Sequence, residues 1–220
     1  MIIGLVLLGL TVILMLFGVA QKVFKGLGMA YWLAFVFVGT MIGCCFIPSF
    51  WLFGVYFNVA GFIAPAVFSV VLFVLAYKAR ELWRAVVAAS AVMALYVAAV
   101  LLLELYVNAA VLAIIAGILC GAAAYIVGNT RLAAVAAAFA GVTVGDIIAA
   151  AVDVYVYKDA MRLGSVGAFD AVVLAAVVAV ALYEAVAAIR RAALNKSRRL
   201  KATEAAEEFD PEEYKRYFGD

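Results

Sequence analysis

The chain has 220 residues, of which 70% are hydrophobic and 14% are charged; its formal net charge is +2 and it contains no histidine. Because a soluble domain is about half apolar and about a quarter charged, this composition excludes a water-soluble fold. The lack of histidine also excludes imidazole metal centres, histidine general bases and Ser-His-Asp or Cys-His nucleophile systems. Carboxylate side chains within the membrane remain as the candidate functional groups.

The first third of the chain predicts three membrane-spanning helices. About 20 apolar residues cross roughly 30 Å of hydrocarbon, and residues 2–20 form one such run. Residues 30–77 carry no charge and are too many for one crossing, so they predict two spans, 30–47 and 59–77. A tight apolar turn between these spans is marked by Pro48, Ser49 and Gly54.

The rest of the chain predicts four more spans and a tail. The apolar run 85–127 divides into two spans that meet at residues 104–108, and residues 132–157 and 166–189 form the last two. The sequence therefore predicts an all-α integral membrane protein of about seven transmembrane helices. Its polytopic domain covers residues 1–189, and residues 190–220 form a basic and then acidic cytoplasmic tail with a short helix.

The distribution of Lys and Arg predicts the orientation, because short loops rich in these residues stay in the cytoplasm. With the N-terminus outside, the outer loops carry only Lys158 and Arg162. The inner segments then hold the whole tail and Lys22, Lys25, Lys78, Arg80, Arg84 and Arg131. We therefore expect a multi-pass protein of the cell membrane with its N-terminus outside and its C-terminus inside.

Two short motifs recur in the same order along the chain. Residues 37–43 and 139–145 both read F-x-G-x-x-x-G, at an offset of 102, and residues 58–62 resemble residues 165–169, at an offset of 107. A duplication would give two parallel three-helix repeats with span four as the linker. Parallel repeats occur in transporters, which bind substrate between them. The alternative is that G-x-x-x-G recurs as a close-packing motif of apolar helices.

Two carboxylates lie where a charge is costly, since a charge at bilayer depth costs on the order of 3 kcal/mol. Asp146 is twelve residues before Lys158, which places it roughly 18 Å deep, and Asp170 lies roughly 9 Å beyond Gly164. Asp153 is nearer the polar turn and can pair with Lys158 or reach water. The predicted ion- or substrate-binding residues are Asp146, Asp170, Asn58, Thr143, Ser165 and Asp153.

Pro65 predicts a helix break in the third span. Its missing N–H frees a carbonyl upstream, near Gly61, and a free carbonyl facing a carboxylate is the arrangement of a cation or proton pathway. The alternatives are that Pro65 only kinks the helix and that Asp146 and Asp170 only hydrogen-bond neighbouring helices.

Several stretches resemble those of a known family. Residues 46–48 (FIP) and 58–65 (NVAGFIAP) look like its G-x-x-x-N-I-P and N-V-G-G-x-x-x-P stretches. Residues 144–148 (VGDII) look like its G-A-D-L-L, and residues 165–170 (SVGAFD) like its I-G-G-A-G-T-F-D-G-I. On these motifs the chain resembles, nearly end to end, the prokaryotic membrane proteins grouped as domain of unknown function 1614. The resemblance implies a shared polar set of Asp146, Asp170, Asn58 and Pro65, and no established activity.

Three functions compete. The first is a transporter or an ion- or proton-conducting protein that uses intramembrane carboxylates. The second is an intramembrane aspartyl protease, in which Asp146 and Asp170 would share a proton and activate water. The third is a non-catalytic membrane assembly or lipid-binding protein. We expect a bilayer and a cation or proton as partners, without a cofactor, metal centre or nucleic acid; an enzyme is the less favoured reading, and a homo-oligomer is left open.

Overall fold

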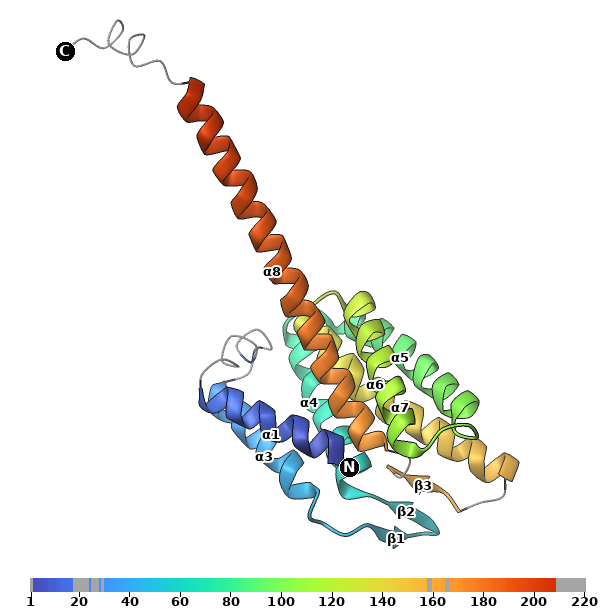
Figure 1. Cartoon of the computed structure of the whole chain (residues 1–220). Coiled ribbons are helices and arrows are strands. Elements are labelled where there is room, and N and C mark those ends of the chain that lie inside the picture. Colours follow the sequence, from blue (N-terminus) through green and yellow to red (C-terminus); the bar gives the residue numbers. More distant parts are fainter. Residues whose placement is uncertain are drawn as a thin grey trace, which may run out of the picture. The chain divides into compact units, whose positions relative to one another are not determined.

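The computed structural model describes residues 2–17, 24, 28, 30–157, 160–164 and 167–208. In these residues the protein is mostly helical, and an apolar helix stands in each of the seven predicted places (Figure 1). The elements in chain order are α1 (Ile2–Leu16), α3 (Tyr31–Cys44), β1 (Phe50–Leu52), β2 (Val55–Phe57), the π-helical turn η1 (Val59–Ile63), α4 (Ala64–Lys78), α5 (Leu82–Leu103), α6 (Ala109–Gly128), α7 (Arg131–Tyr157), β3 (Arg162–Leu163) and α8 (Ala168–Glu208).

Five helical segments of the described chain are long and apolar enough to cross a membrane. They are Val59–Lys78, Leu82–Leu103, Ala109–Gly128, Arg131–Val156 and Ala168–Ser197. The apolar helices α1 and α3 have 15 and 14 residues, which is below the length that spans hydrocarbon. The helical, polytopic character expected from the sequence is therefore confirmed, whereas seven crossings and the N-out orientation stay predictions.

Local signals fix the ends of the helices. The Asn108 side chain accepts a hydrogen bond from Val111 N at 2.9 Å and so caps α6, which ends where Asn129 adopts a left-handed φ of 55°. Thr130 caps α7 through Ala133 N at 3.2 Å, and its hydroxyl donates to Glu81 Oε2 at 2.7 Å. Because Glu81 directly precedes α5, this bond ties the starts of α5 and α7 together, and the two helices run parallel.

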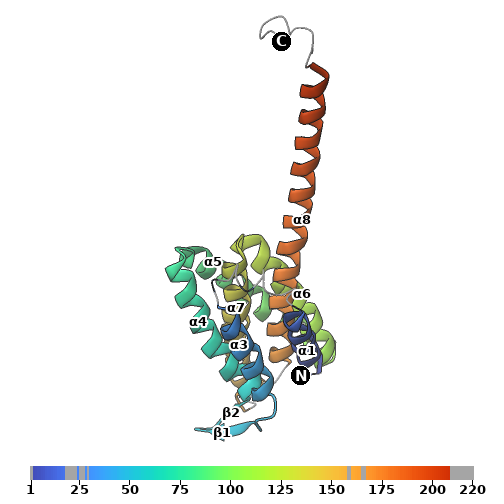
Figure 2. The same ribbon diagram turned by 90° about the vertical axis from the view of Figure 1, so that its left-hand side faces the viewer.

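Helix α7 is the central helix of the bundle and packs against α5, α4 and α6 (Figure 2). Its glycines let α5 approach closely. A Cβ added to Gly141 would lie 2.6 Å from Val92 Cβ, and one added to Gly145 would lie 2.8 Å from Tyr96 Cδ1. The same motif behaves differently in α3, where a Cβ on Gly39 or Gly43 would meet nothing within 4 Å.

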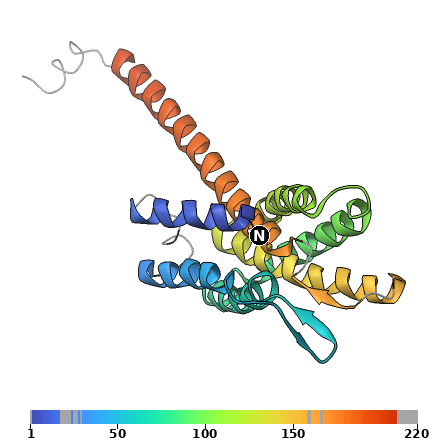
Figure 3. The same cartoon turned by 60° about the horizontal axis from the view of Figure 1, so that its bottom comes forward.

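A three-stranded sheet lies at one end of the bundle, which we call the sheet end (Figure 1), and its β1–β2 hairpin projects away from the helices (Figure 3). Strands β1 and β2 form an antiparallel hairpin, and β3 pairs with β2 in parallel. The sequence interpretation of this segment as a tight turn in an all-α protein is therefore incomplete. Aromatic residues favour the strands: Phe50 stacks on Phe57 across the hairpin. Phe53 and Gly54 have φ values of 52° and 83°, the signs that a two-residue type I′ turn requires.

Two contacts bear on the predicted repeat. Phe37 and Phe139, the first residues of the two F-x-G-x-x-x-G motifs, touch edge to face with ring centroids 5.5 Å apart. Strands β2 and β3 pair Tyr56 with Arg162, an offset of 106 that differs by one from the offset of the second motif. Contact between equivalent positions is what parallel repeats around a common axis would produce, and the repeat itself stays a prediction.

The chain forms two compact units, Met1–Tyr183 and Glu184–Asp220. The first holds the helical bundle and the sheet. The second contains the later part of α8, with exposed basic side chains at Arg190, Arg191 and Lys196. The predicted boundary between residues 189 and 190 falls within α8. The short helix predicted after residue 209 lies outside the described residues.

Candidate functional site

Asp146 lies inside α7, the most buried of the candidate spans, and only 3% of its surface is exposed. Its Oδ2 atom accepts a hydrogen bond from Gly164 N at 2.6 Å. Gly164 directly follows β3 and has a left-handed φ of 79°, a conformation that glycine adopts without strain. The carboxylate is thus held by a main-chain donor from a non-helical segment, which is a short, charge-assisted type of bond when the acid is ionised.

The position of Gly164 is set by its contact with the π-helical turn η1. A Cβ added to Gly61 would lie 2.5 Å from Gly164 O, so the two backbones pass each other in direct contact. The Asn58 side chain accepts from Gly61 N at 2.9 Å, and Asn58 N donates to Leu163 O at 3.1 Å. Asn58 therefore fixes the start of η1 and holds it against the end of β3.

Tyr96 of α5 is the second neighbour of Asp146. Its ring packs on Gly145, and 1% of the residue is exposed. Its hydroxyl oxygen is fully buried and interacts with the Asp146 carboxylate, but it has no partner in regular hydrogen-bond geometry. A buried hydroxyl without a regular bond is costly, which points to a role tied to the neighbouring acid.

Two further carboxylates lead away from Asp146 toward the sheet end. Asp153 stands two turns further along α7 and is half-buried, and Glu104 follows the last residue of α5 and is also half-buried. The charges of both act on Asp146. Burial, and next the charge of Asp153, raise the pKa of Glu104 above its usual value of 4.5. Glu104, Asp153 and Asp146 thus form a series from half-buried to fully buried.

Asp170 is also buried, with 4% of its surface exposed, and it sits in the first turn of α8. Its Oδ1 atom accepts from Gly4 N in the first turn of α1 at 2.9 Å. The first N–H groups of a helix have no acceptor within the helix, and an acid near a helix N-terminus is favourable. Asp170 therefore stabilises the N-termini of both α8 and α1, as expected of a residue that joins two helices.

The remaining predicted residues are placed as follows. Thr143 donates its hydroxyl to Phe139 O of its own helix at 2.7 Å. Pro65 is buried in the first turn of α4, directly after η1, and its carbonyl accepts from Ser69 Oγ at 2.7 Å. Ser165 lies outside the described residues. The structure thus gathers Asn58, Gly61 and Asp146 around Gly164.

Sequence reasoning did not single out Tyr96, Gly164 or Gly4 as partners of the two acids. Tyr96 stands in an apolar stretch without a charged residue between Arg84 and Glu104, so only its contact with Asp146 distinguishes it. Gly164 and Gly4 contribute main-chain N–H groups, which every residue except proline carries. No signal in the local sequence could have identified them.

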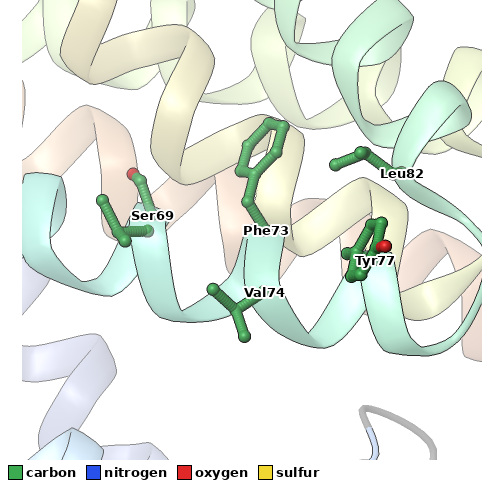
Figure 4. Close-up of a pocket in the computed structure, with 6 residues that line it drawn as sticks. Ser69, Phe73, Val74, Tyr77 and Leu82 are labelled. Atoms are coloured by element: carbon green, nitrogen blue, oxygen red, sulfur yellow. The ribbon is translucent and has the colours of Figure 1, made fainter.

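An apolar groove of about 380 Å³ lies on α4 and the start of α5 (Figure 4). It is lined by Ser69, Val70, Phe73, Val74, Tyr77 and Leu82. None of the predicted binding residues lines it. Within the described part of the chain, no group of three or more His, Cys, Asp or Glu side chains could hold a metal ion.

Comparisons with family models, with curated proteins and with solved structures gave no match to the chain.

Proposed function

We propose that the protein is a small transporter or ion-conducting protein in which Asp146 binds a cation or proton within the membrane. The observation that carries the proposal is the buried Asp146 carboxylate, held at 2.6 Å by Gly164 N inside a helix that is apolar enough to span a bilayer. An ionisable residue at this depth is expensive, and such residues mark ion pathways and proton relays.

The backbone around Asp146 supports this function. The partner of Asp146 lies in a non-helical segment, and that segment crosses the π-helical turn η1 at Gly61. Transporters bind substrates where helices are interrupted, because interrupted backbone leaves main-chain groups for binding. Single π-helical turns are also frequent at functional sites. Asp170 is the second intramembrane carboxylate, and its bond to Gly4 N supports a role in holding α1 against the start of α8.

Ion flux into proteoliposomes tests the proposal. The parent protein should conduct protons or another monovalent cation, and Asp146→Asn should abolish the flux. Asparagine keeps an oxygen that can accept from Gly164 N, so this variant should fold. Glu81→Gln is the matched control, because Glu81 accepts from Thr130 at the opposite end of α7 and the amide keeps that acceptor. A parent without flux for H⁺, Na⁺ or K⁺, or full flux in folded Asp146→Asn, would overturn the proposal.

A further inference from the structure

We propose that the ion carried at Asp146 is the proton, that it arrives from the sheet end over Glu104 and Asp153, and that Tyr96 is a positioning residue for the ionised carboxylate. This inference rests on the proposed function of Asp146. It adds the identity of the ion, its route and a residue that responds to the charge of the site.

The groups around Asp146 fit a proton better than a metal cation. Gly164 presents an N–H to the carboxylate, and Tyr96 presents a hydroxyl. Hard metal cations are bound by several oxygen acceptors, and an N–H donor competes with such an ion for the carboxylate. A phenolic hydroxyl suits a carboxyl group that changes protonation, because it donates to the ionised acid and accepts from the protonated acid.

The environment of the Tyr96 hydroxyl is a separate observation, and it indicates that Asp146 changes its protonation state. Its hydroxyl is buried, directed at Asp146 and outside regular hydrogen-bond geometry. Gly145 leaves room for the ring, since a Cβ there would lie 2.8 Å from Tyr96 Cδ1. A small shift of the ring thus closes the bond to the ionised acid, and protonation of Asp146 reverses the direction of that bond.

The carboxylates give the direction of the route. Residues 146 and 153 are seven positions apart, which places both side chains on one face of α7 with roughly 10.5 Å of rise between them. Glu104 follows α5 near the end of α7, and its charge acts on both acids. A proton leaves the Glu104 carboxyl for the Asp153 carboxylate, and next leaves Asp153 for Asp146, with water carrying it between carboxylates. Each O–H bond that breaks is replaced by one on the next acid.

The opposite half of α7 offers no such series. From Leu132 to Val142 its side chains are buried, and Ala133, Ala136 and Ala137 are fully covered. The hydroxyl of Thr143 is bonded to its own helix. On α7 itself the next charged side chain in that direction is Arg131, about 22 Å of rise from Asp146.

Other titratable groups stand on the elements around Asp146. Cys120 of α6 is directed at Val92 O, at 3.7 Å. Arg162 of β3 is exposed, and Asp170 of α8 is bonded to Gly4. Among the described carboxylates, the two whose charges act on Asp146 are Glu104 and Asp153.

The test uses the full chain in liposomes that contain a pH-sensitive dye. An imposed pH gradient should drive flux in the parent, and replacing K⁺ by Na⁺ should leave that flux unchanged. The double variant Glu104→Gln/Asp153→Asn should slow it by about a hundredfold, the lower end of the range for loss of a proton-transfer group. Glu81→Gln controls for the loss of a carboxylate elsewhere.

Tyr96→Phe removes one oxygen and keeps the ring, so it should fold. Its flux–pH profile should move to higher pH, because the ionised acid loses a donor. In detergent, where no transport is needed, the infrared band of the protonated carboxyl should disappear at a higher pH in this variant than in the parent. Tyr125→Phe, which removes a hydroxyl from α6, should behave as the parent.

The outcomes separate the two proposals. If the parent conducts and Asp146→Asn does not, the function stands. In that case a flux that follows Na⁺ or K⁺, or parent-like rates and pH profiles in both the double variant and Tyr96→Phe, overturns the proton route. A parent without flux for any of these ions overturns both.

Discussion

Gly61 and Gly164 meet backbone to backbone. A Cβ on Gly61 would lie 2.5 Å from Gly164 O, and a Cβ on Gly164 would lie 2.8 Å from Gly61 C. These residues follow the paired strands β2 and β3, so the sheet brings them together. Since Gly164 N is the donor to Asp146, the crossing of these two glycines sets the position of the buried acid.

Gly61→Ala should destabilise the protein and weaken the Asp146 site. The new Cβ meets main-chain atoms, which cannot rotate away, so the cost should be about 1–3 kcal/mol, as for overpacked cores. Thermal unfolding in detergent should show a lower midpoint, and proton or cation flux should fall. Gly39→Ala is the control, because its Cβ would meet nothing within 4 Å. Equal midpoints for the two variants would show that the contact between Gly61 and Gly164 does not hold Gly164 in place.

Gly145→Ala should reduce the flux of the protein, because the substitution displaces Tyr96. A Cβ there would lie 2.8 Å from the Tyr96 ring and would push it away from its present position beside Asp146. The control is Gly43→Ala, the equivalent position of the motif in α3, where the space is open. We expect Gly145→Ala to lose flux by a larger factor than Gly43→Ala in the liposome assay. The idea fails if Gly43→Ala has the larger effect.

The helices were largely predictable from the sequence, and the sheet was not. Residues 59–77 were expected to form one span, and the structure has Val59–Lys78 there. Glu104 and Asn108 correctly marked the turn between α5 and α6, because a charge and a capping residue interrupt an apolar run. The hairpin is as apolar as the helices around it, so hydropathy does not separate the two.

The site was predictable only in part. Burial of Asp146 and Asp170 follows from their positions in apolar runs. Their partners do not, because Gly164 lies 18 residues from Asp146 and Gly4 lies 166 residues from Asp170. The packing of separate elements decides such contacts, and the sequence around each acid carries no trace of it.

Asp170→Ala should loosen α1, because Gly4 N would lose its acceptor. Leaving a buried donor unpaired costs about 1–3 kcal/mol. Limited proteolysis should therefore cleave α1 of this variant sooner than α1 of the parent. Asp170→Asn keeps an acceptor oxygen and should be cleaved at a rate near that of the parent. If both variants are cleaved at the parent's rate, Asp170 does not hold α1.

Glu104 should make stability depend on pH with a defined sign. Burial, and next Asp153, raise its pKa above the usual 4.5, so the folded protein binds this proton more tightly than the unfolded chain. The stability from this group is therefore fully present below pH 4.5 and is lost as the pH rises through the higher, folded pKa. Glu104→Gln should remove that loss. The thermal midpoint of Glu104→Gln minus that of the parent should increase from pH 4 to pH 7. This increase should be smaller when both proteins also carry Asp153→Asn, because the charge of Asp153 helps to raise the pKa of Glu104. A difference that decreases with pH would show that Glu104 is stabilised in its charged form.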